Sequence, residues 1–311
     1  MTTTTDERPA AARLPLAGYA LGAAGAILFA AKGVIIKIAY GWGIDAETLL
    51  ALRMGLSLPF YLVIGAMAVA GLRSRGAALP SAGLVAKALG VGVLGYWFSS
   101  YVDFLGLRDI SASFERLILF TYPMFVALFG ALLFRQPIRR RALAAFAVSY
   151  AGLAVIFLQN LSVSGGDTAR GAGFVFLAAM SFALYQLCAR DIIARMGSGL
   201  FTCIAMTGAA AVALAQFVAL RPVAALMVEP KLFLIGAALA IGATVLPSFL
   251  MNAALQRISA QANATIGTIS PVATMALATL VLGETVTLTE LAGAVLVIAS
   301  IGWFTLADRR G

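Results

Sequence analysis

Long apolar blocks alternate with short polar links along almost the whole chain. A helix that crosses a bilayer needs about 20 largely apolar residues. The blocks that reach this length are residues 17–40, 46–71, 84–106, 112–134, 141–159, 171–191, 200–220, 232–255, 262–282 and 288–307. The pattern therefore predicts an all-α integral membrane protein with ten transmembrane helices.

Residues 1–16, MTTTTDERPAAARLPL, precede the first apolar block. They lack the small-residue cleavage pattern of a signal peptide, and nine further blocks follow the first. We therefore expect a disordered cytoplasmic tail.

The composition supports a membrane protein. Of the 311 residues, 62% are hydrophobic and 11% are charged, whereas soluble domains carry about 25% charged residues. The net charge of +9 is spread over short basic clusters between apolar blocks, which favours membrane topology over nucleic-acid binding. Cys188 and Cys203 both lie in apolar blocks, so we expect buried free thiols and no disulfide.

Lys and Arg residues are unequally divided between the two ends of the predicted spans. If the chain alternates through ten spans, the side that carries the N-terminus holds fourteen of them. The other side holds Lys37, Arg108, Arg116, Arg170, Arg221 and Lys231. The positive-inside rule then places both termini in the cytoplasm, with the chain a multi-pass protein of a bacterial-type inner membrane.

The two halves of the chain contain an internal repeat. Residues 105–138 align without a gap to residues 253–286, at an offset of 148. Each half holds five spans, so the second half enters the membrane from the opposite face. We expect two inverted five-helix repeats, at 17–159 and 171–307, that open alternately to the two sides of the membrane around a central cavity.

The aligned segments also carry shared motifs. The first copy reads LRDISASFERLILFTYPMF and the second LQRISAQANATIGTISPVA. Each has an Ile-Ser-Ala link, a helix with a central proline, a turn resembling Gly-Glu-Thr and a last span punctuated by glycine. The first copy departs from this pattern with Gln136 where the second has Glu284.

These motifs resemble an EamA-type domain. Together with ten spans in two halves, they make the chain resemble the drug/metabolite transporter superfamily and, within it, the bacterial aromatic amino acid exporters. The resemblance implies secondary export of amino acids and related small metabolites, without nucleotide hydrolysis or a cofactor.

Enzyme chemistry is not expected. The chain has no histidine, which excludes a Ser-His catalytic pair and a His-ligated zinc site. It also has no Gly-rich loop ending in Gly-Lys-Ser/Thr, so no nucleotide-driven motor is encoded. We expect no metal site.

Two cations fall inside predicted spans. Lys32 lies about 12 Å and Arg53 about 10 Å from the outer ends of their helices, at 1.5 Å per residue. Each is costly in lipid and normally faces protein or a wet cavity. They either receive a substrate carboxylate or form structural ion pairs, and the lysine stem has the further option of snorkelling outward. The carboxylates that lie toward the same end are Glu47, Asp103 and Glu115.

Several other groups are candidates for the cavity or its motion. Tyr and Trp residues near span centres need hydrogen-bond partners, although they also serve as packing bulk. The expected substrate-binding residues are Lys32, Tyr96, Trp97, Ser100, Tyr101, Tyr122, Tyr185, Ser248, Asn252 and Thr268. The expected gating or coupling residues are Arg53, Asp103, Glu115, Pro123 and Pro271, with Asp103 as proton carrier and the prolines as hinges or static kinks.

Two alternative functions stay open. One is exchange of sugar phosphates or nucleotide sugars within the same superfamily, which requires several Lys or Arg near midplane, and the other is a channel-like protein. The expected partners are the lipid bilayer and small molecules, namely amino acids and, as a second class, cationic drugs. No nucleic acid is expected, and a monomer suffices for this architecture.

Overall fold

The computed structural model describes residues 16–135, 166–267 and 269–296, together with isolated positions between 144 and 158 and at 299. In this part of the chain, seven helical segments are long and apolar enough to cross a membrane. They are Leu16–Gly41, Ala46–Ser74, Ala82–Asp109, Ala112–Phe134, Gly166–Met196, Ser198–Leu220 and Pro230–Leu255. These segments confirm seven of the ten predicted spans.

The other three predicted spans are described less completely. The block 262–282 contains shorter helices, with an apolar helical stretch at Ser270–Leu282. The blocks 141–159 and 288–307 fall largely outside the described residues.

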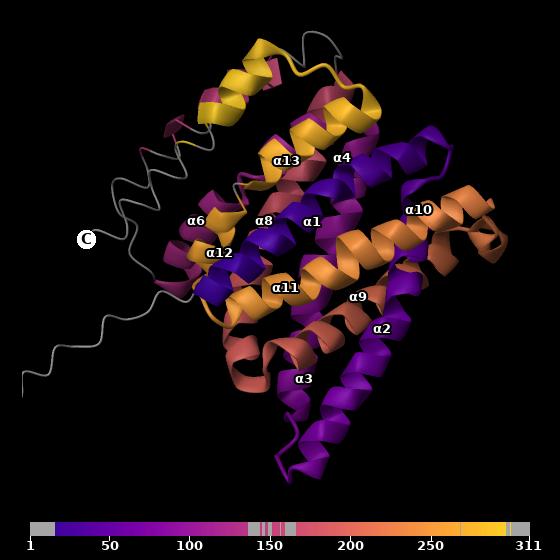
Figure 1. The fold of residues 1–311 in the computed structure, drawn as a ribbon, viewed down its shortest axis with the longest axis vertical. Helices are drawn as coiled ribbons and strands as arrows, with labels where there is room; N and C mark the ends of the chain where they lie inside the picture. The colour runs from indigo at the N-terminus through magenta and orange to yellow at the C-terminus, as the bar shows by residue number, and fades with distance from the viewer. Residues whose placement is uncertain are drawn as a thin grey trace, which may run out of the picture.

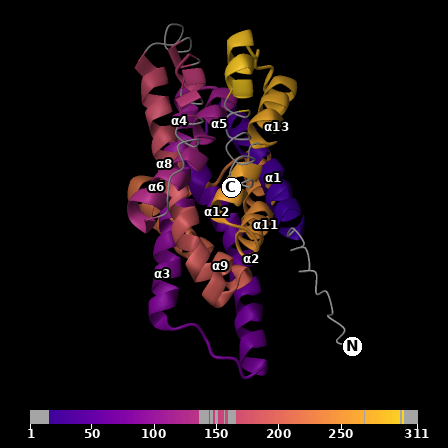
Figure 2. The ribbon, with the colours of Figure 1, turned by 90° about the vertical axis from the view of Figure 1, so that its left-hand side faces the viewer.

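In the first half, two long helices precede two spans that are built from shorter segments (Figures 1 and 2). The elements are α1 (Leu16–Gly41), α2 (Ala46–Ser74), α3 (Ala82–Gly92), the π-helical η1 (Val93–Phe98), α4 (Ser99–Asp109), α5 (Ala112–Leu119) and α6 (Tyr122–Phe134).

The second half repeats this order. Its elements are α8 (Gly166–Met196), α9 (Ser198–Leu220), the short η2 (Val223–Leu226), α10 (Pro230–Ala240), the π-helical η3 (Ile241–Val245), α11 (Leu246–Leu255), α12 (Ala260–Ile266), α13 (Ile269–Leu277) and the π-helical η4 (Ala278–Leu282).

Local geometry recurs at the offset that the sequence predicts. The π-helical segments η1 and η3 begin at Val93 and Ile241, which are 148 positions apart. The serine of each Ile-Ser-Ala link caps the next helix: Ser111 Oγ accepts a hydrogen bond from Phe114 N at 3.1 Å, and Ser259 Oγ accepts one from Ala262 N at 3.1 Å. A serine at this position satisfies a backbone N–H that the helix cannot.

The two halves pack crosswise, so that the first helix of each half contacts the third span of the other (Figure 1). A Cβ added at Gly18 in α1 would lie 2.9 Å from side-chain atoms of Arg257 and Ile258. A Cβ added at Gly171 in α8 would meet Asp109 at 2.8 Å and Ile110 at 3.0 Å. Since the contacted residues are again 148 apart, the same close approach occurs in both halves.

The paired prolines lie at helix breaks. The sequence predicts a proline in the middle of a continuous helix, but α5 ends at Leu119 and α6 begins at Tyr122, which places Pro123 in the first turn of the new helix. Pro271 lies in the first turn of α13 in the same way. Proline fits there because its missing N–H would have had no partner in the helix.

Candidate functional site

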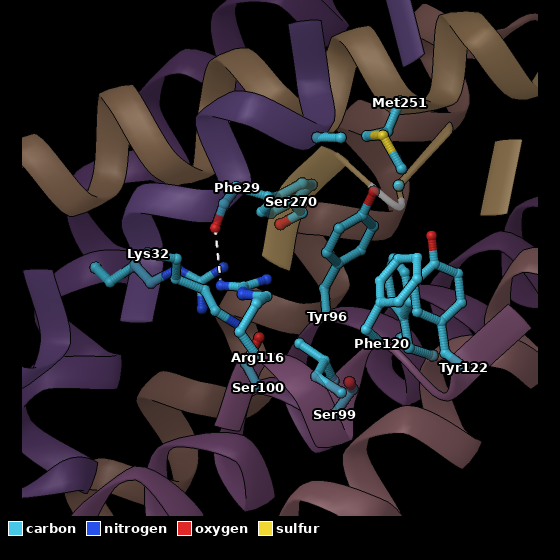
Figure 3. Close-up of a pocket in the computed structure, with 16 residues that line it drawn as sticks. Phe29, Lys32, Tyr96, Ser99, Ser100, Arg116, Phe120, Tyr122, Met251 and Ser270 are labelled. Atoms are coloured by element: carbon cyan, nitrogen blue, oxygen red, sulfur yellow. Dashed lines mark hydrogen bonds between the residues drawn. The ribbon is translucent and has the colours of Figure 1, made fainter. Parts of the chain in front are cut away.

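A cavity of about 70 Å³ lies between elements of the two halves. It borders η1 and both helix breaks (Figure 3). Its lining residues are Ala26, Phe29, Lys32, Arg53, Gly95, Tyr96, Ser99, Ser100, Arg116, Leu119, Phe120, Tyr122, Phe182, Met251, Gly267 and Ser270. On the volume scale at which one water needs about 10–15 Å³, this space holds a few waters.

Arg116 is one of three cations that line the cavity. The count of basic residues in the sequence places it on the outer side of the membrane, but α5 begins at Ala112 and carries Arg116 inward, where the residue is only 5% exposed. Its Nη2 donates a hydrogen bond to the carbonyl of Phe29 at 3.0 Å (Figure 3). The position of Arg116 one turn into an apolar block was the available sequence signal.

Lys32 forms a buried ion pair with Asp103. Its Nζ lies 2.6 Å from Asp103 Oδ2, and both residues are buried. Of the three carboxylates that the sequence offered as partners, the structure selects this one. The lysine charge is thus already compensated by protein.

Glu115 is a fully buried carboxyl group beside this pair. Neither of its oxygens receives a hydrogen bond from a described residue. Its Oε2 lies 3.7 Å from Arg116 Nε, and the side chains of Glu115 and Asp103 are close enough to interact directly. Because two adjacent buried carboxylates repel each other, a proton shared between them would stabilise both.

Arg53 is compensated much less completely. It is 1% exposed, its Nε donates to Thr244 Oγ1 at 2.6 Å, and its guanidinium lies 5.6 Å from the centre of the Phe104 ring. Its Nη1 has no hydrogen-bond partner among the described residues. No carboxylate in the described part of the chain forms a salt bridge with it.

The wall away from the cations is aromatic. Tyr96, Phe120 and Tyr122 lie together on the opposite side from Lys32 and Arg116 (Figure 3). The cavity therefore has a charged side and an aromatic side.

A buried hydrogen-bond network holds Tyr96 in place. Its hydroxyl lies 2.8 Å from the hydroxyl of Tyr185 and accepts a hydrogen bond from Asn252 Nδ2 at 3.0 Å. Tyr185 in turn donates to Asn252 Oδ1 at 2.6 Å. Tyr185 and Asn252 do not line the cavity and act as support behind it.

The structure distributes the predicted binding residues unevenly. Lys32, Tyr96, Ser100 and Tyr122 line the cavity, Tyr185 and Asn252 lie behind it, and three others lie elsewhere. Thr268 falls outside the described residues. Trp97 donates to Gln216 at 2.7 Å, Tyr101 donates to Glu47 at 3.1 Å, and Ser248 bonds the hydroxyl of Tyr61 at 2.9 Å. The expectation that these three contact substrate is not met by this cavity.

One end of the helix bundle is tied together by contacts between the halves. Arg221, at the end of α9, lies 3.4 Å from Asp45 and 3.1 Å from Glu47, at the start of α2. At the same end, Arg170 and Asp109 pair at 2.9 Å. We call these contacts the ionic ties.

Hydrogen bonds and charge also act on Asp45, which lies outside the spanning helices. Partial burial raises its pKa, but the backbone N–H and hydroxyl of Thr48 and the positive charge of Arg221 together outweigh that effect. The pKa of Asp45 is therefore lowered, and its charged form is favoured.

Glu284 connects the two halves at the same end of the bundle through hydrogen bonds instead of an ion pair. Its Oε1 accepts from Ala112 N at 2.9 Å, and its Oε2 accepts from the backbone N and hydroxyl of Ser113 at 3.1 and 2.7 Å. A carboxylate is stabilising at a helix N-terminus, where backbone N–H groups point outward. The Gly-Glu-Thr turn of the second half thus caps α5 of the first half. Its counterpart Gln136 lies outside the described residues.

Comparisons with known proteins agree with this architecture. A family model described as the EamA-like transporter family matches residues 16–158 and 169–306. An uncharacterized transporter of Bacillus subtilis (strain 168), YcbK, is 29% identical over 280 residues, which cover 86% of each chain. A crystal structure of a protein that is 18% identical covers 94% of this chain and 97% of its own, with a TM-score of 0.67, which shows likeness of fold. The chain belongs to the EamA-like transporter family, in the drug/metabolite transporter superfamily, and is a multi-pass membrane transporter and not an enzyme.

Proposed function

We propose that this protein is a secondary transporter that exports amino acids, aromatic and other, and related small metabolites. The observation that carries the proposal is the cavity between the two halves, which combines cations with aromatic rings. A few fixed polar groups in a largely apolar pocket are typical of small-molecule sites.

Alternating access is the mechanism that this arrangement favours. In this conformation the cavity of about 70 Å³ has room for a few waters, and a larger substrate needs it to widen. Substrate entry therefore requires the halves to separate at one end. The ionic ties hold one end closed, and breaking them would open that end while the other closes.

We further propose that both termini are cytoplasmic, which makes the tied end the outer one. Arg116 belongs to the cavity, so the basic residues on the outer side are fewer than the sequence count suggested, and the positive-inside argument becomes stronger. Single cysteines introduced at Thr3 and Gly311, in a background with Cys188 and Cys203 replaced, should resist an impermeant thiol reagent in intact cells. Labelling of either from outside would contradict this orientation.

Exchange of phosphorylated compounds is the second candidate function. The sequence shows two cations inside predicted spans, whereas three cations line the cavity, which strengthens this candidate. The aromatic side of the cavity favours a less polar substrate, so we rank this candidate second.

Counterflow in proteoliposomes tests the proposal. Vesicles loaded with one unlabelled amino acid should accumulate the labelled form transiently and saturably, across a panel that includes phenylalanine and alanine. A channel would show neither saturation nor counterflow. Protein-free vesicles give the background, and uptake of phosphorylated sugars without any amino acid would favour the second candidate.

The cavity assignment has its own test in two aromatic residues of the first half, Tyr122, which is buried, and Trp97, which is partly buried. Tyr122 lines the cavity and Trp97 does not, so Tyr122→Ala should reduce transport of bulky substrates more than that of small ones. Trp97→Ala should change all substrates equally, in proportion to the yield of folded protein. The reverse order would contradict the assignment.

A further inference from the structure

The charges at the cavity do not balance. Lys32, Arg53 and Arg116 line it, and none of its described lining residues is acidic. Asp103 and Glu115 lie behind the wall and compensate at most two of the three cations. If Asp103 and Glu115 share one proton, only one cation is compensated.

Arg53 accounts for most of this excess positive charge. It is 1% exposed, and one of its terminal nitrogens, Nη1, has no partner among the described residues. A buried guanidinium that forms no salt bridge is costly, and its planar fork matches a carboxylate in geometry. An anionic group in the cavity would remove that cost.

We propose that the cavity selects apolar organic acids, which carry a carboxylate but no ammonium, over zwitterionic amino acids. Arg53 is the principal carboxylate ligand and Arg116 the second. Lys32 contributes little to recognition, because Asp103 already neutralises it at 2.6 Å. This inference rests on the proposed function and, among the substrates proposed there, ranks apolar organic acids above amino acids.

The lining accounts for both parts of this preference. An α-ammonium group beside the carboxylate would lie among cations, and no described lining carboxylate is present to accept it. The rest of the ligand faces Tyr96, Phe120 and Tyr122, which supply apolar surface (Figure 3). A phosphate would use the same cations, so the test includes one.

A series of ligands with one aromatic body isolates the charged group. The probes are 3-phenylpropanoate, phenylalanine, 2-phenylethylamine and phenyl phosphate, each titrated calorimetrically into the purified protein near neutral pH. We expect 3-phenylpropanoate to bind at least about tenfold more tightly than phenylalanine, since leaving the ammonium group of phenylalanine buried without an acceptor costs about that much or more. We expect 2-phenylethylamine not to bind.

Substitutions assign the carboxylate ligand. Arg53→Met and Arg116→Met should each weaken 3-phenylpropanoate binding by about tenfold or more, and Arg53→Lys should weaken it less because the charge remains. The matched control is Arg73→Met, an exposed arginine of the same helix α2, which should bind as the unmodified protein does. If Arg53→Met does not fold, Arg53→Gln keeps a donor for Thr244 and replaces it.

The outcomes separate this inference from the proposed function. Failure of 3-phenylpropanoate to bind overturns the inference, as does equal or tighter binding of phenylalanine, 2-phenylethylamine or phenyl phosphate. Unchanged binding by a folded Arg53 variant also overturns it. Phenylalanine counterflow would in each case still support amino acid transport, whereas absent counterflow with the expected binding order would refute the transport proposal and leave the ligand preference standing.

Discussion

The ion pair between Lys32 and Asp103 can be broken from one side or removed altogether. Lys32→Met leaves the carboxylate of Asp103 buried next to Glu115 without its ammonium partner. The double variant Lys32→Met/Asp103→Asn removes both charges and keeps side chains of similar size. Comparing the stabilities of the single and double variants separates the free-energy cost of one buried, unpaired charge from the net contribution of the ion pair.

The magnitudes follow from the distance and the burial. At 2.6 Å and an effective dielectric constant of about 20, the gross attraction is about 6 kcal/mol. Desolvation of the two groups offsets much of it, so that removal of one partner from a buried pair costs about 3–5 kcal/mol. Removal of both is often close to neutral.

Thermal unfolding of the purified protein in detergent measures both effects. We expect Lys32→Met to unfold well below the unmodified protein and the double variant to recover most of the difference, with exposed Lys87→Met as the control. The double variant should also still bind 3-phenylpropanoate. Unfolding of Lys32→Met at the unmodified temperature would refute the reasoning, and a double variant as unstable as the single one would point to lost packing instead.

Three further predictions concern other carboxyl groups. Glu115→Gln should keep the protein folded, because an amide has the shape of the carboxyl and can donate a hydrogen bond to the neighbouring Asp103. If a proton shared by this pair couples transport, the variant should make counterflow insensitive to an imposed proton gradient, and full sensitivity would assign coupling elsewhere. Glu284→Ala should destabilise by about 1–2 kcal/mol in thermal unfolding through loss of the α5 cap, and an unchanged midpoint would show that the cap is dispensable. The lowered pKa of Asp45 means that its hydrogen bonds with Thr48 and its pairing with Arg221 stabilise the protein above the unfolded-state pKa, and that this contribution is lost as the pH falls through the lower folded-state value. When the pH is lowered from neutral to below about 4, the unfolding midpoint should therefore drop less for Asp45→Asn than for the unmodified protein. Equal drops would contradict the assignment.

The sequence predicted the fold in unusual detail because bilayer thickness and gene duplication both leave simple marks. Apolar length alone placed seven described helices to within a few residues. The offset of 148 then held for features that no hydropathy pattern contains, namely the π-helical segments and the serine caps.

The site was harder to predict because depth along a span does not reveal which way a side chain faces. Trp97 and Tyr96 have nearly the same depth, yet only Tyr96 lines the cavity. Arg116 illustrates the opposite error, because a cation one turn inside a helix resembles a link charge in sequence. Both facts depend on packing between the halves.

Comparison of the halves shows how a duplicated scaffold acquires a polar site. At the offset of 148, Asp103, Glu115 and Arg116 correspond to Met251, Asn263 and Ala264, all uncharged. The second half thus keeps the serine cap and the helix break of the first half but has no charged residue at these three positions. A symmetric cavity would present the same groups to a substrate from either half. Charged residues on one half alone orient the bound substrate, because its charged group then lies toward that half. In the mechanism that we propose, the fold supplies the two-sided access, and divergence between the copies supplies the chemical selectivity that acts within it.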